Sequence, residues 1–280
     1  MYVDAKNDIA FKKLFGNSAH KEILISFLNS VLERAEGAKI VDVIINDPAN
    51  LPEIRDLKSS IVDVRCIDQL SHQYIVEMQV ISQPYYAARA QYYSALALGK
   101  QLVPRQPYKD LVPVIFVGVL NFSLFSNPSY LTHHFILDSE THERSMRHLE
   151  FHFIELPKFN LQENQLNTIL EKWVYLLKNA DIMQAPPASF KESELDAALD
   201  ILEQSHWSIA ELEAYERYLD GIRSEIDRLE SVKQEGEYKK TIEIALELLR
   251  DGLDVARVAK ITKLSIEQIE ELRKVKYNAD

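Results

Sequence analysis

Two runs of alternating apolar and polar residues between positions 61 and 80 constrain the fold more than any other feature of this chain. The first reads Ile-Val-Asp-Val-Arg-Cys and the second reads Tyr-Ile-Val-Glu-Met-Gln-Val, with a short polar segment between them. Because successive side chains of a strand point to opposite faces, each run predicts a strand with one apolar face. Together they predict a β-hairpin, which must pack its apolar face on a hydrophobic core.

The register of this hairpin determines which polar side chains meet. If the turn is centred on Leu70, the numbers of opposite residues sum to 140 and Asp63 lies opposite Glu77. A register shifted by two residues sets Asp63 opposite Ile75 or Gln79 and keeps the same face polar. A shift of one residue turns the apolar set of one strand outward and is excluded. We therefore expect Asp63, Glu77 and Gln79 on one face.

Two carboxylates in opposite positions of a sheet repel one another. At a separation of about 5 Å and an effective dielectric constant near 20, the repulsion is roughly 3 kcal/mol, which exceeds the ~0.2 to 1 kcal/mol of a favourable cross-strand pair. A divalent cation would compensate, since Mg²⁺ is commonly held by one or two carboxylates with waters and phosphate oxygens. The alternatives are protonation of one acid, an ion pair with Lys58 or Arg65, and exposure of both acids to solvent at a sheet edge.

Composition narrows the class of protein. With 280 residues, of which 46% are hydrophobic, the chain can bury a sizeable core and is expected to form one main domain with an extension. No uncharged stretch approaches the ~20 residues that span a bilayer, and the charged N-terminus lacks the apolar run of a signal peptide. The single cysteine, Cys66, lies on the apolar face of its predicted strand and indicates a buried thiol. We expect a soluble cytoplasmic protein without a membrane partner.

The net charge of −11 is unevenly distributed, with −2 over residues 1–160 and −9 over residues 161–280. A nucleic-acid-binding protein normally carries a basic surface. The nearly neutral first part still allows a local basic groove, although its Lys and Arg residues form no stripe in the sequence. Any affinity for DNA is expected to be modest and sensitive to salt.

Hydrophobic periodicity predicts an ordered series of elements in the first part of the chain. These are a helix over 8–32 with a break near 16–18, strands over 40–45, 61–66 and 74–80, a helix over 85–102, a buried strand over 112–122, and further strands over 134–137 and 149–155. Pro48 and Pro52 predict a loop over 47–56. The order through residue 122 is helix, three strands, helix, strand.

The last hundred residues are predicted to be helical. Ala185-Pro186-Pro187 reads as a hinge, and a capping box formed by Ser208 and Glu211 begins a long amphipathic helix. Its apolar stripe consists of Ile209, Leu212, Tyr215, Leu219, Ile222, Ile226 and Leu229. Packing of this stripe on the chain's own core is favoured, and a coiled-coil contact in a homodimer is the alternative.

Residues 240–276 resemble a helix-turn-helix array whose last helix begins at Ser265. The acids Glu267, Glu270 and Glu271 have the wrong sign for a helix that reads the major groove, so a protein contact or a regulatory role is favoured over DNA readout. The expected domains are a core over 1–160, a helical extension over 161–235 and a small helical tail over 238–280.

Four segments of the sequence resemble a known family. The order α-β-β-β-α-β, with an Asp on the second strand and Glu-x-polar on the third, resembles the PD-(D/E)XK nuclease superfamily. Within it, the segments KNDIAFKKLFG (Lys6–Gly16), KSSIVDV (Lys58–Val64), IVEMQ (Ile75–Gln79) and FHFIELPKF (Phe151–Phe159) resemble the Rpn family of recombination-promoting nucleases and transposase-like proteins. The resemblance covers roughly the first 160 residues well. It implies an α/β fold with a restriction-endonuclease-like core and mixed sheet, followed by an α-helical C-terminal extension.

The resemblance also implies roles for individual residues. Asp63 and Glu77 match the metal-binding aspartate and glutamate, and Gln79 occupies the position where the superfamily usually has a Lys. Lys58 is a candidate for the missing charge, and replacing Gln79 by Lys is then expected to raise activity. Asp8 matches an acid of the family motif that would complete the metal shell; its alternative role is a helix N-cap.

The implied activity is a metal-dependent DNA endonuclease associated with mobile elements or DNA recombination. Its cofactor would be Mg²⁺, with Mn²⁺ or Ca²⁺ as alternatives, and its substrate DNA. Arg89, Gln91 and Tyr92 on the predicted helix over 85–102 are candidates for approach to the site or for contact with the DNA backbone, against the alternative of a solvated or packed face. The alternative function is a catalytically weak or inactive nuclease-fold module that binds DNA or protein, which the Gln at position 79 and the acidic C-terminal part favour.

Overall fold

The computed structural model of the protein describes residues 1–46, 64–191 and 193–277. The chain divides into two compact units, Met1–Leu219 and Asp220–Asp280. The described part of the chain contains one six-stranded sheet and eight α-helices. The sheet and the helices that cover it belong to the first unit.

The sheet is mixed, and its strands are arranged in the order β1-β2-β3-β4-β6-β5. Their bounds are β1 (Val43–Asn46), β2 (Val64–Asp68), β3 (Gln73–Gln79), β4 (Val114–Leu120), β6 (Leu149–Glu155) and β5 (Leu131–Phe135). The strands β1, β2 and β3 pair antiparallel, β3 pairs parallel with β4 and β4 with β6, and β5 is antiparallel to β6. All seven residues of β4 are buried, which explains its unbroken apolar sequence.

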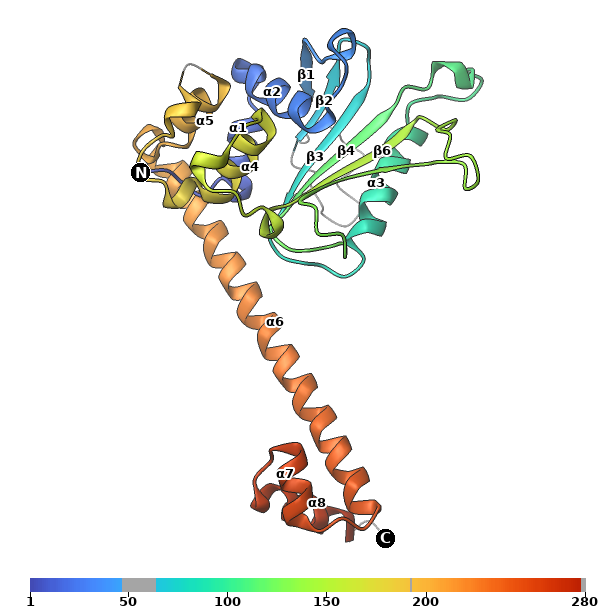
Figure 1. The fold of residues 1–280 in the computed structure, drawn as a ribbon, viewed down its shortest axis with the longest axis vertical. Coiled ribbons are helices and arrows are strands. Elements are labelled where there is room, and N and C mark those ends of the chain that lie inside the picture. Colours follow the sequence, from blue (N-terminus) through green and yellow to red (C-terminus); the bar gives the residue numbers. More distant parts are fainter. Residues whose placement is uncertain (47–63, 192, 278–280) are drawn as a thin grey trace. The chain divides into compact units, whose positions relative to one another are not determined.

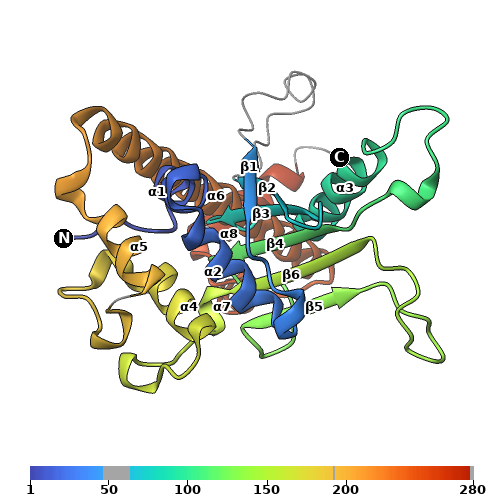
Figure 2. The same ribbon diagram turned by 90° about the horizontal axis from the view of Figure 1, so that it is seen from above.

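Helices cover both faces of the sheet (Figures 1 and 2). One face packs against α1 (Asp8–Phe15), α2 (Lys21–Leu32), α4 (Ile169–Asn179) and α5 (Glu194–Leu202), and the opposite face packs against α3 (Tyr86–Gly99). The first of these two cores contains a cluster of aromatic rings from α1, α2 and α4, namely Phe11, Phe15, Phe27 and Trp173. The second core is smaller and is built around Tyr86, Phe116 and Phe153.

The hairpin has the predicted register. Val64 pairs with Val76 and Cys66 with Tyr74, so opposite residue numbers sum to 140 over the described residues. The apolar faces of both strands belong to the larger core, as expected from their alternation. The opposite face of β3 is also covered, because α3 packs on it and buries Ile75. The alternative that both acids point into solvent at a sheet edge is therefore wrong for Glu77 on β3.

The predicted order of elements through β4 is confirmed, and most differences lie at the ends. The strand predicted over 40–45 is β1 (Val43–Asn46), the strand over 134–137 is β5 (Leu131–Phe135), and the helix over 85–102 is α3 (Tyr86–Gly99). The helix predicted over 8–32 is interrupted near residue 16, as expected. The loop predicted over 47–56 lies outside the described residues.

The remaining helices are α6 (Ile209–Arg250), α7 (Val255–Thr262) and α8 (Ile266–Tyr277). The predicted capping box precedes α6: the Ser208 backbone N–H donates to Glu211 Oε2 at 2.8 Å and the Glu211 N–H donates to Ser208 Oγ at 3.3 Å. The first turns of α6 pack Tyr215 on the larger core of the first unit. Ala245, Val258 and Ile269 form a separate small core in the second unit.

The division between the units differs from the boundaries expected from the sequence. The structure divides the chain after Leu219, whereas the sequence suggested boundaries near residues 160 and 235. The physical reason lies in α4 and α5, whose buried side chains Trp173 and Leu199 complete the core formed by α1 and α2. Along the described ranges, no helix is both long enough and apolar enough to cross a membrane.

Candidate active site

Glu77 and Gln79 lie near the end of β3, on the face of the sheet that α3 covers. Both point to this face because they alternate with Val76 and Met78, which belong to the opposite core. Glu77 is 4% exposed, whereas Gln79, the last residue of the strand, is half-buried. A carboxylate this deeply buried requires a compensating charge or a proton.

Arg89 provides that charge from α3. Its Nη2 donates to Glu77 Oε1 at 2.5 Å and to Gln79 Oε1 at 2.7 Å, and its Nη1 donates to Gln83 Oε1 at 2.5 Å. The guanidinium carbon lies 4.9 Å from the centre of the Tyr86 ring. One cation therefore joins the end of β3 to α3 through three side-chain oxygens.

The orientation of the Gln79 amide follows from a second hydrogen bond. Its Nε2 donates to the carbonyl oxygen of Ile81 at 3.0 Å, so the amide oxygen is the atom that faces Arg89. Gln79 thus presents an acceptor to the cation, where a Lys would present a second positive charge. The geometry explains why an amide is compatible with this position.

The environment of Glu77 disfavours its ionised form. Burial raises the pKa of Glu77 above its ordinary value, and the charge and hydrogen bond of Arg89 offset this increase only in part. A divalent ion bound to Glu77 would stabilise the ionised form of its carboxylate, as Arg89 does in part. Carboxylate and amide oxygens are ligands suited to Mg²⁺ or Mn²⁺.

Two of the predicted site residues, Asp63 and Lys58, lie outside the described residues. The structure does not test their roles. One alternative from the sequence was an ion pair between an acid of this face and Arg65. Glu77 does not make that pair, because its partner is Arg89. Arg65 lies opposite Ile75 on the neighbouring strand, and burial lowers its pKa.

Asp8 is the first residue of α1, on the opposite side of the sheet from α3. Its carboxylate accepts a hydrogen bond from Lys12 at 2.9 Å, an i,i+4 ion pair within the helix. The alternative role as N-cap is wrong, because the side chain of Asn7 caps the helix by accepting from the Ile9 backbone N–H at 2.9 Å. A role for Asp8 in a metal shell stays a prediction.

Of the three α3 residues proposed to approach the site or DNA, the structure brings Arg89 to Glu77. Gln91 and Tyr92 are exposed, and the Tyr92 ring makes an edge contact with Tyr93. Their role in DNA binding stays a prediction. The helical periodicity of Tyr86 and Ala90, both buried on the sheet, is the sequence signal that also turns Arg89 toward β3.

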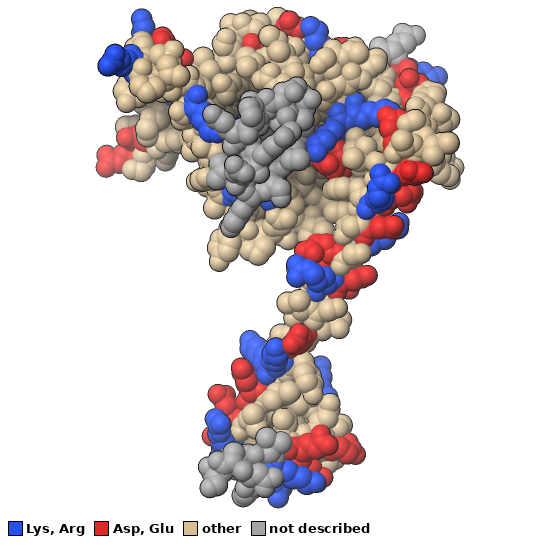
Figure 3. All heavy atoms as spheres, turned by 180° about the vertical axis from the view of Figure 1, so that it is seen from behind, with Lys and Arg blue, Asp and Glu red and all other residues tan. Residues whose placement is uncertain are grey.

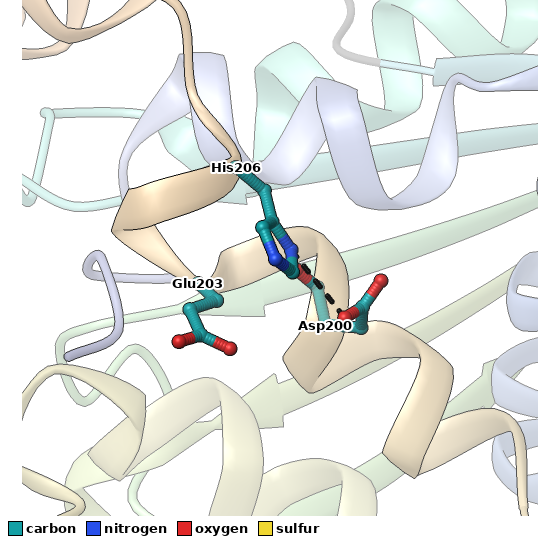
Figure 4. Close-up of side chains that lie close together, drawn as sticks. All are labelled: Asp200, Glu203 and His206. Carbon is teal, nitrogen blue, oxygen red and sulfur yellow. Dashed lines mark hydrogen bonds and ion pairs between the residues drawn. The ribbon is translucent and has the colours of Figure 1, made fainter.

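A second group of potential ligands lies at the end of α5. Asp200, Glu203 and His206 have ligand atoms within 4.8 Å of one another, and Figure 4 shows the imidazole beside Asp200. His206 Nδ1 lies 3.0 Å from the carbonyl oxygen of Asp200 and 3.3 Å from its Oδ1. Since a carbonyl only accepts, Nδ1 carries the proton, and the imidazole satisfies a carbonyl in the last turn of the helix. The same carbonyl also accepts from the backbone N–H of the C-cap residue Glu203 at 3.2 Å, so the imidazole is a second donor at the end of α5.

Charged side chains of both signs share the molecular surface. On the face shown in Figure 3, Lys and Arg occur among Asp and Glu, and the described residues form no continuous basic surface there. This distribution agrees with the absence of a basic stripe in the sequence.

Comparison with known proteins gives one match. A family model described as PD-(D/E)XK nuclease family transposase matches residues 5–235, which include the whole sheet and the helices α1 to α5. No curated protein and no solved structure matches the chain. The family match confirms the resemblance carried by the four sequence segments and, with the mixed sheet and its helices, the predicted fold class.

Proposed function

This chain belongs to the PD-(D/E)XK nuclease family transposases, and from that premise we propose that it is a metal-dependent DNA endonuclease that acts in recombination of mobile elements. Nucleases of this family generally use divalent metals. The observation that carries the proposal is the buried carboxylate of Glu77, held by one cation beside Gln79. A buried acid in an apolar sheet is costly to fold, and a catalytic role accounts for it.

The proposed metal site pairs Glu77 with Asp63. Asp63 immediately precedes Val64, and Val64 lies opposite Val76 in the described register, which supports the original expectation that the two acids oppose one another. Asp8 stays a proposed ligand on the resemblance alone, since α1 lies on the opposite side of the sheet from the face that carries Glu77. When bound, Mg²⁺ or Mn²⁺ lowers the pKa of a coordinated water and neutralises charge on the phosphate oxygens.

The side chains of the chain perform the remaining tasks. Glu77, as a carboxylate, would bind the ion on the face of β3 that α3 covers. Gln79 would orient the attacking water by hydrogen bonding, since its amide carries no charge. Lys58 remains a proposed source of positive charge near the phosphate, and Arg89, Gln91 and Tyr92 remain proposed contacts with the DNA backbone.

We test this function by incubating purified protein with plasmid DNA and Mg²⁺, Mn²⁺ or Ca²⁺, beside the Asp63→Ala and Glu77→Gln variants. The wild type is expected to nick the plasmid with Mg²⁺ or Mn²⁺ and to stop when the metal is removed by a chelator. Each variant is expected to lose about 100-fold or more of the rate, because loss of an outer-shell partner of a metal already costs about 10- to 100-fold and these residues are proposed as direct ligands. Nicking that persists undiminished in both variants contradicts the proposed site.

The second candidate function is a nuclease-fold module that binds DNA or protein without cutting DNA. The Arg89–Glu77 ion pair favours it, because a guanidinium competes with a metal for the same carboxylate. DNA binding without cleavage in any metal would support this function instead.

We further propose that the protein acts in the cytoplasm. Homodimerisation through the C-terminal helices is proposed from the apolar stripe of α6, of which Ile226 and Leu229 are exposed. Sedimentation of the purified full-length chain tests this contact: a monomer at tens of micromolar concentration would contradict it.

A further inference from the structure

We propose that Arg89 supplies, from α3, the positive charge that the superfamily usually provides with a Lys at the position of Gln79. This inference rests on the proposed endonuclease function and deepens it. It assigns to Arg89 direct contact with the phosphate whose ester bond is cleaved, and to Gln79 the role of a positioning residue that holds the guanidinium in place.

The geometry places the cation where a Lys at position 79 would bring its own. Arg89 Nη2 lies 2.7 Å from Gln79 Oε1, so the two side chains already occupy one site. The same nitrogen lies 2.5 Å from Glu77 Oε1, the proposed metal ligand. If Glu77 holds a metal, a cation at this distance from that ligand would be available to a phosphate bound there.

The guanidinium has donor capacity left for a ligand. The two terminal nitrogens carry four N–H groups, of which three donate to Glu77, Gln79 and Gln83, and the side chain is 24% exposed. The buried Nε–H also finds no acceptor among the described residues. A buried donor without a partner is costly. A phosphate oxygen is a suitable acceptor, since guanidinium binds phosphate through paired N–H groups.

The neighbouring side chains are arranged to hold Arg89 and to exclude a second cation. The Gln79 amide is oriented by the carbonyl of Ile81, and the Tyr86 ring lies under the guanidinium. A Lys at position 79 would bring its ammonium to the guanidinium, and like charges at such a distance repel. Gln at position 79 and Arg at position 89 therefore form a matched pair.

This inference changes the result expected for Gln79→Lys. Without Arg89, the substitution should raise activity, because it adds the missing charge. With Arg89 in place the charge is already present, so Gln79→Lys alone is expected to give no gain. The double variant Arg89→Ala/Gln79→Lys separates the two cases.

The experiment measures plasmid nicking with Mn²⁺ for the wild type, Arg89→Ala, Arg89→Lys, Gln79→Lys and the double variant. Arg89→Ala is expected to lose about 100- to 1,000-fold of the rate, the effect of removing one donor to a developing negative charge. The double variant is expected to nick at least about tenfold faster than Arg89→Ala. Arg89→Lys is expected to retain more activity than Arg89→Ala. The matched control is Arg217→Ala on α6, which removes a 72% exposed Arg and should stay within about twofold of the wild type.

A second readout distinguishes this role from a structural one. Binding of Mn²⁺, measured by calorimetry and by the shift in melting temperature, should be retained or tightened in Arg89→Ala, because a competing cation leaves Glu77. Loss of Mn²⁺ binding together with no rescue by Gln79→Lys would show that Arg89 only shapes the site, and would overturn the inference.

Two further outcomes distinguish failure of this inference from failure of the proposed function. A wild type that cleaves and an Arg89→Ala variant that cleaves equally well would overturn the inference and leave the proposed function intact. A wild type that cleaves with no metal would overturn both.

Discussion

Glu77 illustrates how a single residue sets stability against function. Because burial raises the pKa of Glu77, the folded chain binds its proton more tightly than the unfolded chain does. The stability that this group contributes is therefore complete below the ordinary pKa of 4.5 and is lost as pH rises through the folded value. At neutral pH the ionised carboxylate reduces the stability of the metal-free protein.

The substitution Glu77→Gln should consequently leave the metal-free protein as stable as the wild type or more stable. Arg89 is not stranded by the change, since it keeps Gln79 and Gln83 as acceptors. We expect the melting temperature in chelator at pH 7.5 to be equal or higher, and Mn²⁺ to raise it for the wild type alone. A fall of several degrees in chelator would instead identify the Arg89–Glu77 pair as a structural requirement.

How much of the site the sequence predicts can be judged residue by residue. The alternation of β3 placed Glu77 and Gln79 on one face, and the structure agrees. Arg89 was among the residues proposed to approach the site, but its ion pair with Glu77 was not predicted, because Arg89 follows Glu77 by twelve residues on another element and only packing of α3 on the sheet brings the two together. Asp63 and Lys58 keep the roles that the resemblance implies.

At the scale of elements, the pairing of β5 with β6 contains a contact that should respond to pH. His133 and His152 are directly opposite one another, and their Nδ1 atoms lie 2.6 Å apart, so one ring donates and the other accepts. Glu150, itself paired with Arg144 at 2.6 Å, lies 3.5 Å from His152 Nε2. Burial lowers the pKa of His133 below 6.5, and the nearby charge of His152 lowers it further. The charge of Glu33 acts in the opposite direction but is the smaller effect.

The sign of the pH effect follows from that lowered pKa. The unfolded chain binds the proton of His133 more tightly than the folded chain, so the stabilising contribution is present above pH 6.5 and is lost as pH falls through the folded value. His134, also with a lowered pKa, acts in the same direction. The carboxylate of Glu150 does not titrate in this range: burial raises its pKa, but the nearby His152 and Arg144 side chains outweigh this and hold it at about 2.

We therefore expect the amides of β5 to exchange with deuterium faster relative to those of β4 when the pH is lowered from 7.5 to 5.5. His133→Gln, which cannot take up a proton at this position, should reduce the pH dependence. Exchange rates corrected for the intrinsic effect of pH test this expectation. An unchanged ratio between the two strands in the wild type would contradict it.

The sequence predicted the existence and order of helices and strands better than their end residues and better than their division into units. The strand over 149–155 was predicted with its observed bounds, since apolar residues and a following Pro define it in the sequence. The segment from 161 to 219 was assigned to a helical extension because the resemblance is clear only over roughly the first 160 residues. Its burial depends on contacts between α5 and helices almost 200 residues earlier, and no local pattern reports such contacts.

On the scale of the whole molecule, α6 is the one helix that runs from the first unit into the second. No residue of α6 between Glu216 and Ile244 is fully buried, and Leu219, which is partly buried, packs against the larger core of the first unit. The second unit depends on Ala245, Val258 and Ile269, each fully buried, with a few partly buried neighbours. A core of this size in a unit of fewer than about 80 residues rarely supplies more than about 3 to 5 kcal/mol of stability.

The two units should accordingly unfold independently, and Val258→Asp tests this in the full-length chain. A carboxylate at this position would be buried without a partner, at a cost comparable to the whole stability of the second unit. We expect calorimetry to show loss of the smaller transition, with the transition of Met1–Leu219 unchanged in temperature, and circular dichroism to show a loss of helix. The control Ala256→Asp places the same side chain at an exposed position of α7 and should retain both transitions. If Val258→Asp instead lowers both transitions together, the two units share stability through α6 and the independence inferred from their separate cores is wrong.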